Sequence, residues 1–195
     1  LNLEIRAGER VGLIGATGSG KSTMVDLLMG LLEATEGRLV VDGQDMHDSD
    51  QPDLLNAWRA TIAHVPQTIY LADSSIAENI AFGVPKHKID MERVRKAASQ
   101  AQIASFIEES DMGYDIFVGE RGIRLSGGQR QRIGIARALY KQAKIFVFDE
   151  ATSALDNSTE AAVMRAIEGI GEDHTIFIIA HRLTTIARCD RVIEL

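Results

Sequence analysis

The sequence has little of what would place a protein inside a membrane, in an oxidising compartment or on nucleic acid. Its 195 residues include a single cysteine, which excludes an internal disulfide, has no zinc-ligand spacing around it and fits a reducing, cytosolic setting. No stretch approaches the ~18 apolar residues that span a bilayer, and no charged-then-apolar signal peptide opens the chain. Acidic residues outnumber basic ones, and the formal net charge of −7 argues against nonspecific binding to DNA or RNA.

The composition indicates one globular domain. With 45% hydrophobic and 25% charged residues, a chain of this length can bury a sizeable core. Leu1–Ile5 alternates as a β-strand does, and residues 192–195 form a second strand-like run. Because both ends resemble interrupted strands, we expect the chain to be cut from a longer protein at both ends.

The most informative stretch is Gly15–Ser22, which fits G-x-x-x-x-G-K-[ST] between an apolar run and an amphipathic helical pattern. Its glycines let successive N–H groups point into one concavity, and the following helix adds its positive dipole end, so the stretch suits a phosphate. Lys21 would reach the β- and γ-phosphates, and the Ser22 hydroxyl would bind Mg²⁺. A Gly/Ser-rich turn that binds nothing would not need Lys-Ser directly after its last glycine. The helix is predicted to continue through the apolar positions Met24, Val25, Leu27, Leu28, Leu31 and Leu32.

Strands and helices alternate along much of the remaining chain. Short strands are indicated within 37–43 and at 62–65, with a short helix at 54–60 between them. Pro66 ends the second of these strands because proline cannot donate to the ladder, so Gln67 lies in a loop. The continuous apolar runs at 145–148 and 175–180 are typical of strands buried on both faces.

A mostly helical region interrupts this alternation. A turn and a short helix are expected over 73–83, and Asp90 is placed to cap a helix that runs to about Glu109. We therefore predict a single α/β domain over residues 1–195 with a P-loop NTPase core, a mostly parallel sheet and a small N-terminal antiparallel β part. Residues 1–69 and 141–195 would form the core, and about 70–140 an inserted helical subdomain.

Polar residues stand where the predicted core strands end. Asp149 and Glu150 follow the strand over 145–148, His181 follows the strand over 175–180, and the phosphate loop follows Ile14. The carboxyl edge of an open parallel sheet is where ligands bind, so these residues should converge on one site. Two adjacent carboxylates at the end of a buried strand are costly unless a cation lies near them, and Mg²⁺ is the expected cation.

A second candidate anion site begins at Ser126. Ser126 and Gln129 fit a capping box, so an ordinary helix start is the alternative interpretation. Gly127 and Gly128 in the first turn each cost ~1 kcal/mol of helix propensity, a cost that backbone amides presented to an anion would justify. Three arginines farther along are expected on a solvated face of this helix: Arg130, Arg132 and Arg137.

These motifs together resemble the nucleotide-binding domain of ATP-binding cassette (ABC) transporters over nearly the whole chain. Gly15–Ser22 is similar to the Walker A loop of the family, and residues 125–129 to its LSGGQ signature. Asp149 matches the Walker B aspartate and Glu150 the catalytic carboxylate. The order of Walker A, LSGGQ and Walker B is very specific, whereas Walker A alone would leave every P-loop ATPase and GTPase possible.

The resemblance implies an ATPase that uses ATP and Mg²⁺. Gln67 would be the Q-loop glutamine, residues 153–156 the D-loop and His181 the switch histidine, so the implied catalytic residues are Glu150, His181 and Gln67. The implied Mg²⁺ ligands are Ser22, Gln67 and Asp149. The implied nucleotide contacts are Gly15, Thr17, Gly18, Ser19, Gly20, Lys21, Ser22, Thr23, Ser126, Gly127, Gly128, Gln129 and Asp156.

The resemblance also implies partners. Two copies, or a copy and a paralogue, would pack head-to-tail around two ATP molecules, at the cytoplasmic face of a membrane and attached to a transmembrane domain. Residues 74–80 and 118–122 resemble exporters more than importers. Family members stack adenine on an aromatic residue upstream of Walker A, and none precedes Gly15 here, so we expect that contact to lie outside this chain.

Three other functions remain as alternatives. An importer ATPase is the nearest of them. A chromosome-maintenance ATPase head shares the same motifs but carries a long coiled coil, whereas the segment between Gln67 and Ser126 is short and has no sustained heptads. A soluble translation factor of the same family would usually carry two cassettes, and this chain has one.

Overall fold

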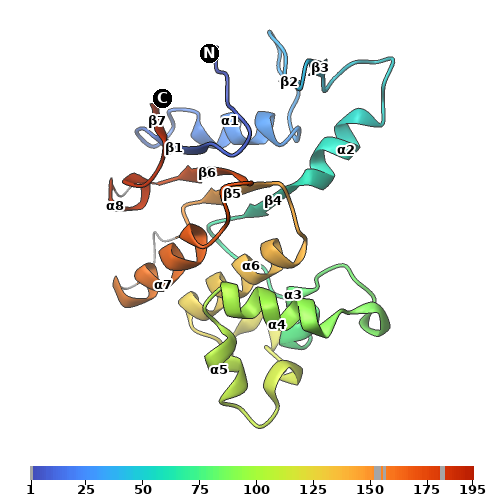
Figure 1. Ribbon diagram of the computed structural model, residues 1–195, viewed down its shortest axis with the longest axis vertical. Coiled ribbons are helices and arrows are strands. Elements are labelled where there is room, and N and C mark those ends of the chain that lie inside the picture. The colour runs from blue at the N-terminus through green and yellow to red at the C-terminus, as the bar shows by residue number, and fades with distance from the viewer. Residues whose placement is uncertain (1, 152–154, 156, 181–182) are drawn as a thin grey trace.

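A five-stranded sheet crosses the middle of the computed structural model, which describes residues 2–151, 155, 157–180 and 183–195 (Figure 1). The strand order is β4-β5-β6-β1-β7, and each neighbouring pair is parallel. The predicted mostly parallel α/β sheet is therefore confirmed. Its strands are β1 (Arg10–Ile14), β4 (Ile62–Val65), β5 (Ile145–Asp149), β6 (Thr175–Ile179) and β7 (Arg191–Glu194).

Both faces of the sheet are covered by helices, which is why its central strands are apolar on both sides. On one face Val147 and Phe177 pack with Val25 of α1 (Lys21–Leu28), and Trp58 of α2 (Leu54–Thr61) lies against the same cluster. On the other face Phe146 and Phe148 pack in the cluster that contains residues of α6 (Gly127–Tyr140), α7 (Asn157–Glu168) and α8 (Leu183–Ile186). Side-chain direction alternates along each strand, so a residue's position decides which helical layer it faces.

The small antiparallel part is a hairpin of β2 (Val40–Val41) and β3 (Gln44–Asp45). Asp42 and Gly43 connect the strands with φ values of 48° and 81°. Positive φ at both central residues is what a tight hairpin turn of the primed type requires. The predicted antiparallel element is confirmed.

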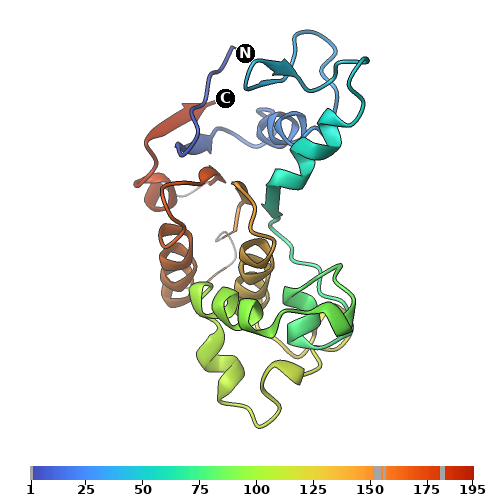
Figure 2. The same ribbon diagram turned by 45° about the vertical axis from the view of Figure 1, so that its right-hand side comes forward.

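The remaining helices lie at the end of the molecule opposite the two termini (Figure 2). They are α3 (Ile76–Ile80), α4 (Met91–Gln100) and α5 (Ala104–Glu108), joined by single 3-10 turns at Lys86–Lys88, Gly113–Asp115 and Glu120–Gly122. α6 packs on both α3 and α4 and also on β4, so one apolar cluster runs from the sheet into this helical region. None of the described helices is long and apolar enough to cross a membrane.

Two helices end earlier than the sequence predicted. α1 stops at Leu28 because Gly30 adopts φ 67° and the Leu31 N–H bonds to the Asp26 carbonyl, a Schellman ending that leaves Leu31 58% exposed. The helix predicted from Asp90 to about Glu109 is two helices, α4 and α5. Gln102 has φ 58° and the Ile103 N–H bonds to the Ala98 carbonyl, so the same motif ends α4 with glutamine in the usual glycine position.

Two further predictions were wrong. Residues 2–5 form no strand, since alternation needs a neighbouring strand to pair with and the ladder of β1 begins at Arg10. The α6 arginines do not form a solvated face, because their guanidinium groups bond to carbonyl oxygens of neighbouring segments. Arg130 donates to Leu125 at 2.6 Å, Arg132 to Gln102 at 2.6 Å and Arg137 to Asn79 at 2.9 Å.

Candidate functional site

The phosphate loop connects the carboxyl end of β1 to the start of α1, as the motif predicted. Gly15 has φ 149°, and a Cβ there would lie 2.5 Å from the Leu195 carbonyl oxygen, so only glycine fits. Lys21 is 7% exposed and its ammonium group donates to the carbonyl oxygens of Gly15 at 2.8 Å and Ala16 at 2.9 Å. The lysine is thus folded back over the loop that precedes it.

The loop fits a phosphate group. Because the N-cap residue of α1 is Gly20, no side chain caps the amides of its first turn. The space where a Cβ would stand at Gly18 and Gly20 is open within 4 Å. The buried hydroxyl of Ser19 has no hydrogen-bond partner among the described residues, although buried hydroxyls normally have one. Amides, a lysine and an unpaired hydroxyl in one concavity are the donors that a phosphate requires.

The end of β5 carries the predicted acidic pair. Asp149 and Glu150 are both half-buried, and Glu150 holds φ 48°, a left-handed backbone that is uncommon for a residue with a side chain. Its N–H donates to the Ile179 carbonyl oxygen at 3.0 Å, which stabilises this turn. Such strained residues cluster at functional sites.

The structure brings Gln67 to Glu150. Gln67 follows β4, which pairs with β5, and its Nε2 atom donates to Oε2 of Glu150 at 2.8 Å. Ser22 lies in the first turn of α1 with an exposed side chain. Of the five strands, β6 alone separates β5 from β1, so the ends of those two strands lie about 10 Å apart in the plane of the sheet. This spacing leaves room for phosphates and a cation between them.

The electrostatics at Asp149 favour a cation. Loss of hydration on burial raises the pKa of Asp149 above its usual value. The carboxylates of Glu150 and Asp26 act in the same direction, while His64 and Lys21 oppose the shift. An ionised carboxylate is therefore costly here, and a cation would lower that cost.

The oxygen donors at this edge fit Mg²⁺. In the described part of the chain, no cluster of three or more His, Cys, Asp or Glu side chains could hold a metal alone. Mg²⁺ commonly uses only one or two protein oxygens together with substrate phosphates and water. A hydroxyl from Ser22, a carboxylate from Asp149 and the amide oxygen of Gln67 match that chemistry.

The signature stretch begins α6 with the predicted capping box. Ser126 Oγ accepts from the Gln129 N–H at 3.2 Å, and Gln129 Oε1 accepts from the Ser126 N–H at 2.8 Å. Its two glycines differ. A Cβ on Gly128 would lie 2.1 Å from the Thr159 methyl carbon of α7, whereas one on Gly127 would meet only a guanidinium nitrogen of Arg130 at 4.0 Å. Close packing against α7 explains why residue 128 is glycine. It does not explain the glycine at position 127.

Two predicted residues, His181 and Asp156, lie outside the described residues. Thr17 and Thr23 are exposed beside the phosphate loop.

Sequence reasoning missed His64, to which it assigned no role. The available signal was a histidine near the end of the strand over 62–65; in the structure its side chain is exposed and its strand pairs with the one that ends in Asp149.

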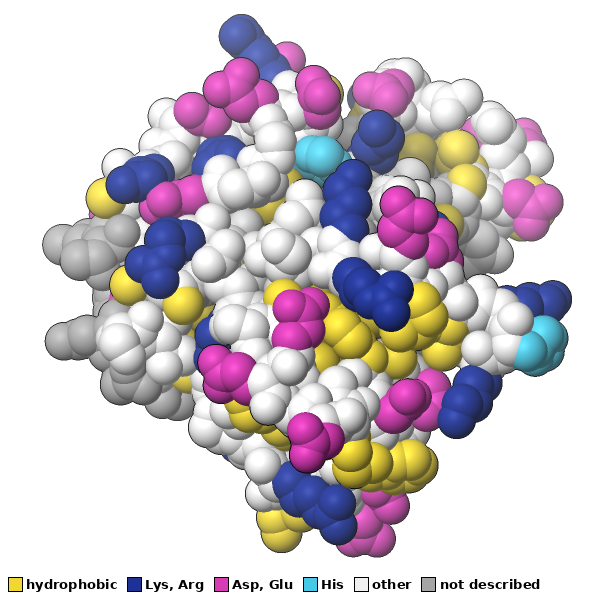
Figure 3. Space-filling view, turned by 60° about the horizontal axis from the view of Figure 1, so that its bottom comes forward, with side chains coloured by type: hydrophobic (Ala, Val, Ile, Leu, Met, Phe, Trp, Pro, Cys, Tyr) yellow, Lys and Arg dark blue, Asp and Glu magenta, His cyan; other side chains and the backbone are white. Residues whose placement is uncertain are grey.

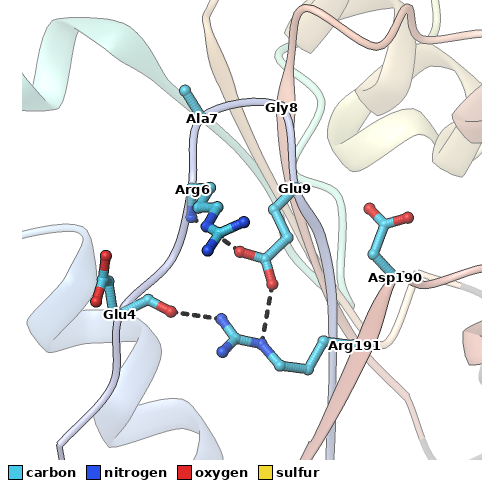
Figure 4. Close-up of a pocket in the computed structure, with 7 residues that line it drawn as sticks. All are labelled: Glu4, Arg6, Ala7, Gly8, Glu9, Asp190 and Arg191. Carbon is cyan, nitrogen blue, oxygen red and sulfur yellow. Dashed lines mark hydrogen bonds and ion pairs between the residues drawn. The ribbon is translucent and has the colours of Figure 1, made fainter.

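A separate crevice of about 500 Å³ lies at the amino ends of β1 and β7, lined by charged residues from 4–9 and 190–191 (Figure 4). Arg191 pairs there with Glu9 at 2.9 Å and donates to the Glu4 carbonyl oxygen. Because strand ends of opposite polarity lie at opposite edges of a sheet, this crevice is not the predicted nucleotide site.

Comparison with known proteins gives one consistent family. The model of the ABC transporter family matches residues 1–153. An ATP-dependent lipid A-core flippase of Ralstonia nicotianae is 44% identical over 100% of this chain and 32% of its own length. A flippase of the same description from Chromohalobacter salexigens is 45% identical over 99% of this chain and 32% of its own length.

Among solved structures, a bacterial Atm1-family ABC exporter with ATP bound superposes with a TM-score of 0.88 and 41% identity. That match covers 99% of this chain and 33% of the exporter chain, so this chain spans about a third of its relatives. The family match, the superposed fold and the motifs at the sheet edge agree. The chain belongs to the ABC transporter family and corresponds to the ATP-binding domain of its exporters.

Proposed function

We propose that this chain hydrolyses ATP with Mg²⁺ and that the hydrolysis drives export across a membrane. One observation carries the proposal: a single edge of one parallel sheet presents the phosphate loop, the Asp149-Glu150 pair and Gln67. These are the groups that catalyse phosphoryl transfer to water, which depends on positioning and charge neutralisation. The exporter and the flippases among its relatives favour export over the importer alternative.

Each residue has a distinct task in this proposal. Lys21 leaves the loop carbonyls to bind the β- and γ-phosphates, and Ser22, Asp149 and Gln67 hold Mg²⁺. The cation, when bound, neutralises charge on the phosphate oxygens. Glu150 accepts a hydrogen bond from the attacking water and orients it. Gln67 holds the Glu150 carboxylate by the 2.8 Å hydrogen bond. His181 contacts the γ-phosphate or that water.

A second copy would complete the site. The first turn of α6 is exposed at Ser126 and Gly127, and its amides would bind the ATP held by the partner's phosphate loop, with Gln129 beside them. We assign Asp156 to contact with the nucleotide as well. Two chains would then pack head-to-tail about a two-fold axis with two ATP molecules between them. The acidic strand ends would repel a like-charged partner, so dimerisation should depend on ATP with Mg²⁺.

The helical region offers a surface for a membrane-embedded partner. Five large hydrophobic side chains are exposed there: Tyr70 at 59%, Phe82 at 51%, Met112 at 60%, Phe117 at 48% and Ile123 at 80%. Hydrogen bonds hold the backbone beneath these side chains. Buried Asn79 bonds to both backbone groups of Ala72, and the segments at 74–76 and 116–118 pair with each other. Figure 3 shows hydrophobic side chains among charged ones on the face turned toward this end.

These surfaces define the proposed organisation. Residues 1–69 and 141–195 form the ATP-binding core, and about 70–140 the helical subdomain that meets a transmembrane domain at the cytoplasmic face of a membrane. The chromosome-maintenance alternative lacks support, since the described residues between 67 and 126 form only short helices. The formal net charge of −7 likewise disfavours nucleic acid as a partner.

The test is phosphate release by the full-length protein in proteoliposomes, with ATP and Mg²⁺ and with EDTA in place of Mg²⁺. Hydrolysis that needs the cation and is lost in Lys21→Ala supports the ATPase. ATP-dependent extrusion of a lipid-linked or amphiphilic probe supports export. Absence of hydrolysis in the unmodified protein would refute the proposal.

A further inference from the structure

A histidine with no assigned role lies beside the acidic strand end. β4 pairs with β5 so that the Cα of His64 is opposite that of Val147. Residues two positions apart on a strand point to the same face, so Asp149 shares the face of Val147. His64 and Asp149 are therefore diagonal neighbours on one face of the sheet, within reach of long side chains.

That face is the one covered by α1. Val147 packs in the cluster that contains Val25 of α1, and Ile62, two residues before His64, belongs to the same cluster. α1 also carries Lys21 at its start and Asp26 one turn later. The side chain of His64 is exposed at the end of β4 on this face, near the half-buried carboxylates of Asp149 and Asp26.

The electrostatic interactions agree with this arrangement. Loss of hydration lowers the pKa of His64, and the attraction of Asp149 and Asp26 for the imidazolium opposes that shift. Reciprocally, His64 acts on the pKa of Asp149 against the effect of burial. Both carboxylates therefore lie close enough to His64 to act on the same ring.

His64 differs in chemistry from the other strand positions on this face. The cluster on this face consists of apolar side chains, and the strand positions in it on β1, β5 and β6 are valine, leucine, isoleucine or phenylalanine. His174 shows the structural alternative, since its ring packs edge-on to Phe146 and contacts the Gly171 carbonyl oxygen at 3.2 Å, far from any acidic strand end. His64 instead is an exposed polar ring that interacts electrostatically with two carboxylates, those of Asp149 and Asp26.

We propose that His64 is a positioning residue of the nucleotide site: with Asp26, it orients the Asp149 carboxylate and so sets how tightly the site holds a divalent cation. The inference rests on the proposed ATP and Mg²⁺ site. Groups behind a metal ligand typically change metal affinity by about 10- to 100-fold when they are removed. His64 touches neither the phosphates nor the reacting water in this scheme.

The test uses Mn²⁺ as the probe, titrated into the full-length protein with a saturating non-hydrolysable ATP analogue and followed by electron paramagnetic resonance. His64→Leu keeps an apolar side chain of similar size and removes both ring nitrogens, and we expect its Mn²⁺ affinity to fall at least about tenfold. His64→Gln keeps a polar group that can donate, and we expect most of the affinity to return. His87→Leu, at an exposed histidine in the 3-10 turn Lys86–Lys88, is the matched control and should behave as the unmodified protein.

Affinity for the same analogue in EDTA measures the phosphate loop without metal. It should be unchanged in His64→Leu, because Lys21 and the loop amides are intact. Unchanged Mn²⁺ affinity in His64→Leu overturns the inference, and so does equal loss of metal-free nucleotide binding, since the histidine then serves the loop or the fold as a whole. If the unmodified protein bound nucleotide but no Mn²⁺, the proposed Mg²⁺ site itself would fail, which is a distinguishable result.

Discussion

Gln67 donates a hydrogen bond of 2.8 Å from Nε2 to Oε2 of Glu150, although 83 positions separate the two residues in sequence. The loop after β4 and the turn after β5 are therefore joined by a direct side-chain hydrogen bond. Since Glu150 also carries a left-handed backbone with φ 48°, its carboxylate is fixed from two sides. The orientation of the proposed catalytic carboxylate thus depends on the position of the Gln67 loop.

Glu150→Gln should bind ATP but hydrolyse it at least about 100 times more slowly, because the amide keeps the shape and loses the base. The amide oxygen can still accept from Gln67, so the loop contact should survive. ATP-bound dimers should accumulate, as seen by light scattering beside phosphate release. Normal turnover would move the catalytic role to another residue, with His181 next in line.

Lys21→Ala should lose tight ATP binding and keep its fold. The Lys21 ammonium donates to two loop carbonyls in this structure, while its charge-assisted bonds to phosphates would be the strongest in the site. Titration calorimetry measures the binding, and circular dichroism measures the fold. Unchanged affinity for ATP with Mg²⁺ would show that the phosphate loop is wrongly assigned.

The two signature glycines should respond differently to alanine. Gly128→Ala places a methyl group 2.1 Å from the Thr159 methyl carbon, so we expect a loss of about 1–3 kcal/mol in the free energy of unfolding. Gly127→Ala would meet only the Arg130 guanidinium at 4.0 Å, an ordinary contact, and gains helix propensity, so its stability should be retained or slightly raised. Urea titration measures both changes.

ATP-dependent dimerisation of the same two glycine variants distinguishes a packing role from a role in nucleotide binding. Gly127→Ala should weaken it, because the methyl group stands at the exposed start of α6 where the partner's ATP is proposed to bind. If Gly127→Ala dimerised with ATP like the unmodified protein, that glycine would have no contact with nucleotide.

Mixing variants tests whether the site is shared between two copies. A Lys21→Ala copy and a Ser126→Arg copy, both full-length, should each be inactive alone. The mixed dimer would contain one intact site, built from the second copy's Lys21 and the first copy's Ser126, and should regain hydrolysis and ATP-dependent association. If neither returns on mixing, the head-to-tail arrangement is excluded.

The single cysteine should be unreactive while the protein is folded. Burial, together with the neighbouring Asp190, raises the pKa of Cys189 from 9.0 to about 11. At pH 8 the folded protein therefore holds about a hundredfold less thiolate than the unfolded chain, and alkylation by iodoacetamide should be slower by about that factor than in urea.

The same shift makes stability depend on pH. The folded state binds the thiol proton more tightly between pH 9 and 11, so the free energy of unfolding should fall as pH rises through that window. Urea midpoints at pH 8 and pH 10 measure the fall, and Cys189→Ala should reduce it. An equal fall in both proteins would contradict the assignment to Cys189.

Local patterns in the sequence predicted the features that depend on neighbouring residues. The phosphate loop, the capping box of Ser126 and Gln129, and the buried strands β5 and β6 all form where the patterns indicated. In each case the deciding interaction lies within a few residues: a loop curls on its own glycines, a cap bonds three positions ahead, and a continuous apolar run needs cover on both faces. The same patterns carried the family resemblance.

What local patterns could not supply came from contacts between distant segments. Gln102 ends a helix whose periodicity continued past it, because burial of Ile103 outweighs the cost of a left-handed glutamine. Arg137 was predicted in solvent and bonds to Asn79, 58 positions away. His64 gains its neighbours Asp149 and Asp26 only through strand register and the packing of α1 on the sheet. These outcomes depend on which face of each element meets which partner, and periodicity within one segment carries no information about the partner.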